Sequence, residues 1–376
     1  MSYWSEIVGQ AGAVEQLAAA AEPNAPEATN AWLITGPAGS GRSNLAELFA
    51  AALIARNEEE RERVLAQVRA NTHPDFAALI TQKVIISIEE VRSLVTTAYY
   101  APADGRYRVI LIEDADRMPE RTSNVLLKAL EEPPERTVWI LCAPSEADLL
   151  PTIRSRVRSV KLSTPQIAEI AQLLAERENI DVARAEQAAR LAQHHIGMAR
   201  RLATDDEALA RRQRSIDLVL SSETLSEKMA AAAELLAIAT ADAEALAELN
   251  DAQEREDALR NLGIEPGAAI PPTLRSQIKA LEDDQKRRAT RNLRDGIDRV
   301  LTDLLSLYRD VLMIQLDAQQ PLINVEHTSS IQRHAHDRDA ARTIEMLEAI
   351  EKARERIARN VTPALALEAM LASSIR

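Results

Sequence analysis

The chain has 376 residues, of which 46% are hydrophobic and only 3% aromatic, and its formal net charge is −13. This length predicts two or three domains, and the acidic balance argues against a surface that coats nucleic acid. The single cysteine, Cys142, excludes an internal disulfide, and no apolar stretch reaches the roughly 18 residues of a membrane-spanning helix. We therefore expect a protein of the reducing cytoplasm without a membrane partner.

Apolar runs alternate with helical patterns through the first part of the chain. A helix is predicted at Ala11–Ala21, and a capping box at Ser87–Glu90 predicts the start of another, which reaches about Tyr99. Runs typical of strands occupy residues 31–35, 76–80, 106–112, 137–142 and 158–162. Strands that alternate with helices predict a parallel sheet covered by helices on both faces, with a ligand site at the carboxyl ends of the strands.

From Thr164 onward the pattern is helical almost to the end of the chain. One helix is expected to start near Pro165, and a long one is expected over residues 273–316. Apolar positions in the last part of the chain are expected to hold an oligomer together, since helices can bury side chains across subunits. These positions include Leu301, Leu304, Leu305, Leu312, Leu365 and Leu367.

A glycine-rich segment, Gly36–Ser43, follows the first predicted strand and precedes a helical run. Strand, glycine-rich loop and helix in this order are typical of a P-loop, whose backbone N–H groups surround nucleotide phosphates. Arg42 stands where lysine is usual and keeps the charge on a larger, planar group, and Ser43 stands where a hydroxyl holds Mg²⁺. The candidate nucleotide contacts are Gly36, Gly39, Ser40, Gly41, Arg42 and Ser43. The alternative is a glycine-rich turn with no ligand.

The third predicted strand ends in two acids, Glu113 and Asp114. In a P-loop ATPase such acids hold Mg²⁺ and orient the attacking water, usually in the order Asp then Glu. Here the order is reversed, so Glu113 falls on the metal side with Ser43, and a misplacement of ~1 Å can cost ~100-fold in rate. The next strand ends in Ala143 and Pro144, where a polar sensor of phosphate is common. We therefore expect weak or absent ATP hydrolysis, with ATP and Mg²⁺ still possible ligands.

Five further segments carry a family resemblance. They are Ile7–Gln10, Ser123–Pro134, Ser155–Val157, Gly197–Arg200 and Asn360–Glu368. In this order they are similar to segments of the clamp-loader AAA+ family, and most similar to the delta-prime subunits of bacterial DNA polymerase III. The resemblance implies an adenine-side contact for Val8, a second sensor for Arg200, and for Arg156 an arginine that acts in trans on a neighbouring subunit's ATP.

The resemblance also implies three domains: an AAA+ P-loop α/β domain at residues 1–163, a small helical lid at 164–206 and an all-helical collar at 207–376. It implies a hetero-oligomer with gamma/tau and delta subunits that loads the sliding clamp onto primed DNA, within the holoenzyme whose reaction is DNA-directed DNA synthesis. In this complex the chain would be a stator with little ATPase activity of its own.

Two other functions are alternatives to the clamp-loader stator. The first rival is an ATP-hydrolysing motor subunit of the gamma/tau type, which a lysine at position 42, the order Asp–Glu and a polar sensor would favour. The second is a nucleic-acid-binding helical protein with a relic P-loop, which the acidic charge disfavours.

Family members commonly carry four cysteines in a zinc module, whereas residues 55–74 contain none, so we expect no zinc.

Overall fold

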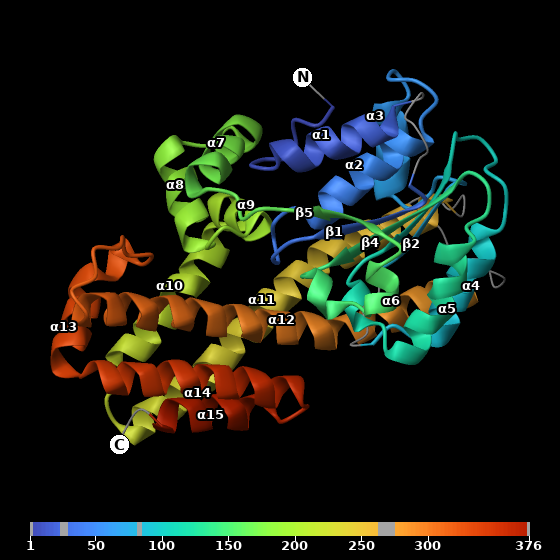
Figure 1. Ribbon diagram of the computed structural model, residues 1–376. Helices are drawn as coiled ribbons and strands as arrows, with labels where there is room; N and C mark the ends of the chain where they lie inside the picture. The colour runs from blue at the N-terminus through green and yellow to red at the C-terminus, as the bar shows by residue number, and fades with distance from the viewer. Residues whose placement is uncertain (1–2, 23–28, 81–84, 262–274, 374–376) are drawn as a thin grey trace. The chain divides into compact units, whose positions relative to one another are not determined.

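Figure 1 shows the computed structural model, in which the backbone is described for residues 3–22, 29–80, 85–261 and 275–373. Side chains are described for the same residues except 246, 248–261, 275–278 and 280–291. The chain divides into two compact units, Met1–Thr204 and Asp205–Arg376. Each unit has its own hydrophobic core. The further separation of residues 164–206 as a lid domain stays a prediction.

A five-stranded sheet forms the centre of the first unit, with the strand order β2-β3-β4-β1-β5. The strands are β1 (Ala31–Thr35), β2 (Phe76–Leu79), β3 (Arg108–Ile112), β4 (Thr137–Ala143) and β5 (Arg158–Lys161). All neighbouring strands pair in parallel, which confirms the predicted sheet. β3 begins later than predicted because the backbone N–H of Arg106 donates to the carbonyl of Ile54, at 2.9 Å, rather than to a neighbouring strand.

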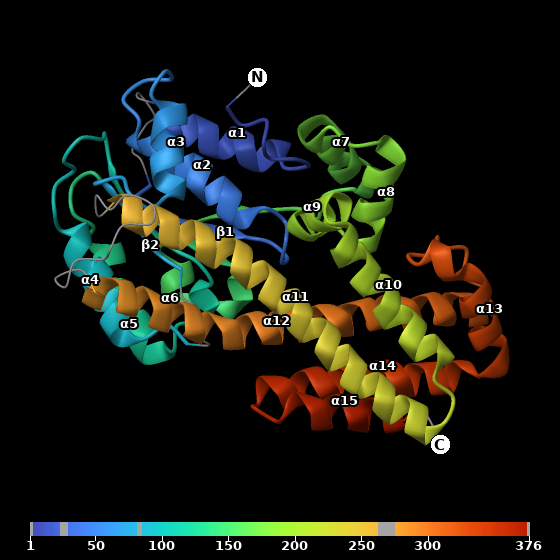
Figure 2. The ribbon, with the colours of Figure 1, turned by 180° about the vertical axis from the view of Figure 1, so that it is seen from behind.

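Helices cover both faces of this sheet (Figures 1 and 2). The core on one face includes residues of α1 (Ala11–Ala21), α2 (Arg42–Ile54) and α3 (Arg61–Arg69). The core on the other face includes residues of α4 (Ile88–Ala98) and α5 (Glu120–Glu131). Within β1, Trp32 and Ile34 join the first core, and Ala31 and Leu33 join the second. This burial on both faces explains why the strands are continuous apolar runs in the sequence.

Short helices follow the strands, and three longer ones complete the first unit. The short ones are η1 (Ala115–Arg117), η2 (Glu146–Asp148) and α6 (Pro151–Arg154). The longer ones are α7 (Ile167–Glu178), α8 (Val182–Leu191) and α9 (Ile196–Thr204), which pack on one another. α7 begins after Gln166 and not at Pro165, because the Glu169 carboxylate accepts the Gln166 backbone N–H at 2.8 Å and closes a capping box there.

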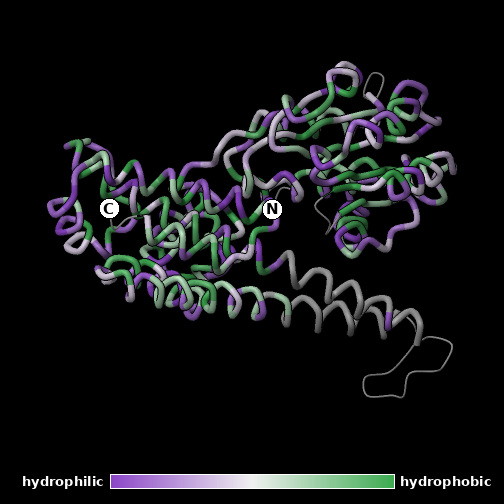
Figure 3. Tube along the Cα trace, turned by 90° about the horizontal axis from the view of Figure 1, so that it is seen from below, coloured by the Kyte–Doolittle hydropathy of each residue, from purple (hydrophilic) through white to green (hydrophobic). Residues whose placement is uncertain are grey.

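The described residues of the second unit form helices and no strand. The helices are α10 (Asp206–Ser221), α11 (Leu225–Asn261), α12 (Arg275–Gln315), η3 (Val325–His327), α13 (Thr328–Asp337), α14 (Ala340–Ala358) and α15 (Pro363–Ala372). In the coloured parts of these helices, Figure 3 shows hydrophobic and hydrophilic residues alternating, as helices that pack on one face require. Among the described parts of the whole chain, no helix combines the length and apolarity needed to cross a membrane.

The structure corrects the role expected for the leucines of the second unit. Leu301, Leu304 and Leu367 are at most 1% exposed and belong to the internal core of this unit, so they are not available to a neighbouring subunit. Leu365 is 60% exposed and is the member of the predicted set that presents a large apolar surface to solvent. Helical periodicity marked all of these positions as apolar but did not distinguish the inner from the outer face.

A buried polar network joins α10 to α12 and to the segment that follows α12. The Arg212 guanidinium, in a residue only 5% exposed, donates to Asp303 and to the side-chain oxygen of Asn324, both at 2.8 Å. Asn324 in turn donates to Asp310 at 3.0 Å, and Asn324 and Asp310 are both fully buried. A charged side chain can be buried in this way only when it is paired and hydrogen-bonded. This network therefore fixes how α10 packs against α12 and the segment that follows it.

Candidate functional site

The glycine-rich loop lies between β1 and α2, as its sequence predicts. Gly39 (φ 75°) and Gly41 (φ 91°) adopt left-handed backbone conformations that residues with a side chain rarely take. Ser40 is 2% exposed and its hydroxyl has no hydrogen-bond partner, and the buried Nη1 of Arg42 has none either. Two unpartnered buried polar groups at the N-terminus of a helix fit an anionic ligand such as a phosphate group.

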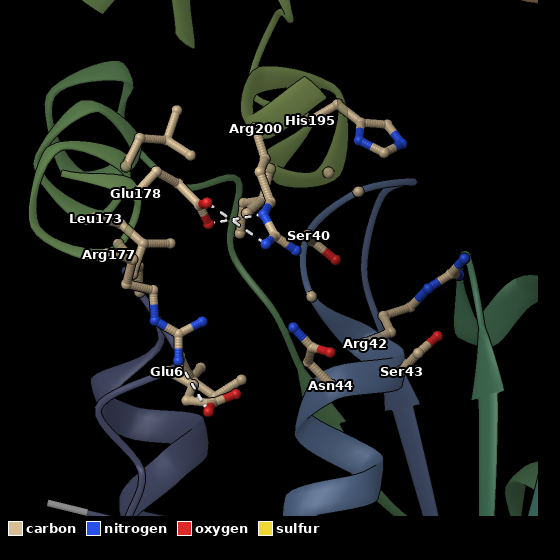
Figure 4. Close-up of a pocket in the computed structure, with 17 residues that line it drawn as sticks. Glu6, Ser40, Arg42, Ser43, Asn44, Leu173, Arg177, Glu178, His195 and Arg200 are labelled. Carbon is tan, nitrogen blue, oxygen red and sulfur yellow. Dashed lines mark hydrogen bonds and ion pairs between the residues drawn. The ribbon is translucent and has the colours of Figure 1, made fainter. Parts of the chain in front are cut away.

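This loop forms one wall of a cavity of about 650 Å³ in the first unit (Figure 4). The other walls come from the N-terminal segment, Glu6–Val8, and from residues of α7 and of the start of α9. The predicted site residues that line it are Val8, Gly39, Ser40, Gly41, Arg42, Ser43 and Arg200. The structure therefore brings together candidates from the N-terminal segment, the glycine-rich loop and α9, whereas Gly36, Glu113, Asp114 and Arg156 are not among the lining residues.

Two arginines that line the cavity, one on α7 and one on α9, each face a carboxylate of the same cavity. Arg177 contacts Glu6 at 2.8 Å, and Nε of Arg200 contacts Glu178 at 2.7 Å, as Figure 4 shows. Burial raises the pKa of Glu6, but Arg69, at 2.5 Å, and Arg177 lower it more, so the pKa lies below its ordinary value. A phosphate entering this cavity would compete with carboxylates that already satisfy the arginines.

Asp114, the second of the two acids after β3, lies beside Arg42 of the loop. Asp114 has a left-handed backbone (φ 48°) and lies 4.0 Å from Nη2 of Arg42 and 3.1 Å from Arg117. The substituted arginine and the displaced acid therefore face each other. At the end of β4, Ala143 is fully buried, and the hydroxyl of Ser145, the first polar side chain after the strand, accepts the backbone N–H of Ala147 at 3.2 Å. The Ser145 side chain is therefore engaged within its own turn.

The start of α9 is fastened to the loop. The backbone N–H of Ile196 donates to the carbonyl of Gly39 at 3.1 Å, and a Cβ at position 39 would come within 2.3 Å of the His195 ring. His195 is exposed and lines the cavity against Gly39. It reaches the loop from a segment far away along the chain.

Arg156 follows α6, near the end of α5 and apart from the cavity lining. Its Nη2 contacts Glu131 at 2.5 Å, and its Nη1 donates to the carbonyl of Thr152 at 2.8 Å and to the Ser155 hydroxyl at 3.0 Å. The side chain is 34% exposed, so it combines fixed contacts with access to solvent.

The described residues contain no group of three or more His, Cys, Asp or Glu side chains placed to hold a metal ion. His73 is 4% exposed, and its Nδ1 accepts the backbone N–H of Asp75 at 3.0 Å. Its ring therefore has a structural role at the start of β2.

A parallel α/β domain with a glycine-rich loop between β1 and α2, followed by helices, is the architecture typical of P-loop proteins. Two family models match the chain: that of the DNA polymerase III delta subunit matches residues 9–166, and that of its C-terminal part matches residues 290–374. In these two parts the chain is similar to DNA polymerase III delta subunits.

Curated relatives are similar to part of the chain. DNA polymerase III subunit delta-prime of Pseudomonas aeruginosa is 34% identical over 153 residues, which are 39% of this chain and 47% of the relative. DNA polymerase III subunit gamma/tau of Mycobacterium bovis is 30% identical over 159 residues, 41% of this chain and 27% of the relative. The chain thus spans less than half the length of these relatives. A solved gamma subunit-related protein from Thermotoga maritima aligns with a TM-score of 0.48 and 18% identity over 96% of this chain and 98% of its own.

Proposed function

We propose that this chain is a stator subunit of the bacterial DNA polymerase III clamp loader. With gamma/tau and delta subunits it would load the sliding clamp onto primed DNA. The observation that carries this proposal is the match of two delta-subunit models in separate parts of the chain, residues 9–166 and 290–374. The first test is purification of the chain from cell extract, which should recover the other loader subunits with it. Recovery of the chain without them would contradict the proposal.

The stator part of the proposal depends on the loop and the acids after β3. The unpartnered Ser40 hydroxyl and Arg42 Nη1 favour binding of a phosphate, while the pairing of Arg42 with Asp114 favours weak hydrolysis. Ser43 and Glu113 are the side chains that would hold Mg²⁺ with the nucleotide, and the ion would neutralise phosphate charge. Binding without efficient turnover suits a subunit that positions its neighbours. Its place in the reducing cytoplasm stays part of the same proposal.

The rival function, an ATP-hydrolysing motor of the gamma/tau type, has the support of the 30% identity to the Mycobacterium bovis protein. Against it stand the arginine at position 42, the contact between Arg42 and Asp114, and the buried Ala143 at the end of β4. A motor needs a cation on the phosphates and a carboxylate on the water, and here those two groups neutralise each other.

Arg156 would be the residue through which this chain acts on the nucleotide of a neighbouring subunit. It lies outside the lining of the cavity in its own chain, is 34% exposed, and carries a planar group suited to phosphate oxygens. An arginine supplied in trans is worth ~10³–10⁵ in rate at the site that it serves.

We expect Arg156→Ala to leave folding and assembly intact and to lower DNA-stimulated ATP turnover and clamp loading by the complete complex. Arg156→Lys should restore little, because a point charge cannot make the two parallel hydrogen bonds of a guanidinium. The measurement is ATP turnover on primed DNA by a reconstituted loader. The matched control is Arg154→Ala. Arg158→Ala is less suitable, because the Arg158 guanidinium lies 5.1 Å from the centre of the Trp32 ring and so also supports the fold. Unchanged turnover with Arg156→Ala would remove the trans role.

A further inference from the structure

The ion pair with Glu131 gives Arg156 a fixed position at the rim of the α/β domain. Glu131 is the last residue of α5, and its Oε1 lies 2.5 Å from Nη2 of Arg156. The other guanidinium nitrogen, Nη1, is held by the Thr152 carbonyl and the Ser155 hydroxyl, at 2.8 Å and 3.0 Å. The guanidinium is therefore bound on two sides, by a charged partner from another helix and by neutral partners from its own segment.

The backbones of both partners are anchored in the core. Leu130, next to Glu131, is 6% exposed, and Ile153, near Arg156, is fully buried. The backbone N–H of Arg156 also donates to the Ile153 carbonyl at 2.9 Å. Because each side chain starts from a fixed backbone, the ion pair holds the guanidinium in a defined place and not merely near the surface.

The position of Glu131 in its helix indicates that this pairing is not incidental. A carboxylate in the last turn of a helix lies at the negative end of the helix dipole, where a cation is preferred. Arg156 supplies that cation from outside the helix, so the helix end and the carboxylate both favour the same location for the guanidinium. With both side chains partly exposed, at 34% and 47%, the pair can still be reached by a ligand from solvent.

We propose that Glu131 is a positioning residue for Arg156, which holds the guanidinium ready to contact a phosphate on a neighbouring subunit. This inference rests on the proposed function. Arginine has five N–H donors, and among the described residues the structure places three acceptors around this one, so the guanidinium retains donors for phosphate oxygens. A guanidinium that is already ordered loses less conformational freedom when it binds, which favours the reactive arrangement.

The test compares Glu131→Ala and Glu131→Gln in the complete reconstituted complex. We expect Glu131→Ala to lower the kcat of DNA-stimulated ATP turnover about two- to five-fold, the range of an exposed charged pair, with KM for ATP unchanged. Glu131→Gln should restore part of the loss because the amide oxygen still accepts from Nη2. Glu132→Ala is the matched control, since this exposed acid is the next residue and should leave turnover unchanged.

The double variant Glu131→Ala, Arg156→Ala separates this inference from the function on which it rests. If Glu131 acts through Arg156, the double variant should turn over ATP as slowly as Arg156→Ala alone. Additive losses, an unchanged rate with Glu131→Ala, or a faster rate with it would each overturn the positioning role while leaving the trans role of Arg156 in place. An unchanged rate with Arg156→Ala would instead overturn the proposed function itself.

Discussion

The substitution of arginine for lysine at position 42 changes more than the shape of one cation. Nη2 of Arg42 lies 4.0 Å from Asp114, whose carboxylate also contacts Arg117 at 3.1 Å. A lysine would present a compact charge to phosphate, whereas the guanidinium reaches sideways to the acid. The two groups that a hydrolytic site would direct at the nucleotide are therefore directed at each other.

We expect the purified chain to turn over little or no ATP, and we expect Arg42→Lys not to restore turnover. The reversed acids Glu113 and Asp114 and the apolar end of β4 remain in that variant, so the water and the phosphate still lack their partners. The measurement is steady-state ATP hydrolysis by the chain alone, with Ser43→Ala as the background control. Hydrolysis at a rate normal for a loader, lost in Ser43→Ala, would contradict this expectation.

Part of this site could be predicted from the sequence because the residues concerned are neighbours along the chain. The loop Gly36–Ser43 and the acids after β3 each depend on neighbouring residues, and both were located correctly in the fold. The partners Glu6, Glu178 and His195 could not be predicted, because they reach the cavity from segments far apart in the chain. Nothing in their own sequence distinguishes them from surface residues.

The same distinction between local and distant signals holds for helices and strands. The capping box at Ser87 is confirmed: the Glu90 carboxylate accepts the Ser87 backbone N–H at 2.8 Å, and α4 starts at Ile88. α3 begins at Arg61, just after a turn in which the Asn57 side chain accepts the backbone N–H of Glu60 at 3.0 Å. Apolar strand runs were found within a few residues, since burial on both faces leaves little ambiguity.

Asp75, just before β2, ties this strand to the loop that leads into β3. Its fully buried carboxylate accepts the backbone N–H groups of Ala103, Asp104 and Gly105 at 2.6, 2.7 and 2.7 Å, and a guanidinium N–H of Arg108 at 3.1 Å. We expect Asp75→Asn to lower the free energy of unfolding by roughly 2–4 kcal/mol at pH 7, because an amide group would face these donors with one of its own. Urea denaturation measures this change.

The effect of Asp75→Asn should depend on pH. Burial raises the pKa of Asp75, but the three backbone N–H groups and Arg108 lower it more, so the folded-state pKa lies below its ordinary value. The stabilisation by the Asp75 carboxylate is then fully present above the pKa of the unfolded state, about 4. It is lost as the pH falls through the lower pKa of the folded state. The difference between wild type and variant should shrink toward pH 3. Asp104→Asn, with an exposed carboxylate, is the control, and an equal loss there would contradict the role of Asp75.

At the scale of the whole molecule, two separately cored units divide the chain after Thr204. The sequence predicted that the second of them is helical, because a 3.6-residue periodicity is visible without tertiary contacts. It could not predict which apolar residues face inward. Leu367 is 1% exposed and Leu365, two residues away on the same helix, is 60% exposed.

These two leucines allow assembly to be tested apart from stability. We expect Leu367→Ala to lower the free energy of unfolding by about 2–5 kcal/mol, since it leaves a cavity in the core. Leu365→Asp should leave the unfolding midpoint nearly unchanged and weaken co-assembly with loader subunits, if α15 contacts a neighbour. The measurements are thermal unfolding of the chain and size-exclusion chromatography of the reconstituted complex. Normal assembly by Leu365→Asp would exclude this face of α15 as an interface.

The buried network around Arg212 has a consequence for exchanging parts between related proteins. Arg212 on α10, Asp303 on α12 and Asn324 beyond α12 depend on one another, although they are far apart in the sequence. A chimera joined between residues 212 and 303 would take the guanidinium from one parent and its carboxylate from the other. Where the parents differ, a buried charge would lose its partner, at a cost of about 3–5 kcal/mol. A junction between Thr204 and Asp205 keeps the network within one parent, so transplantation of the second unit should begin at Asp205.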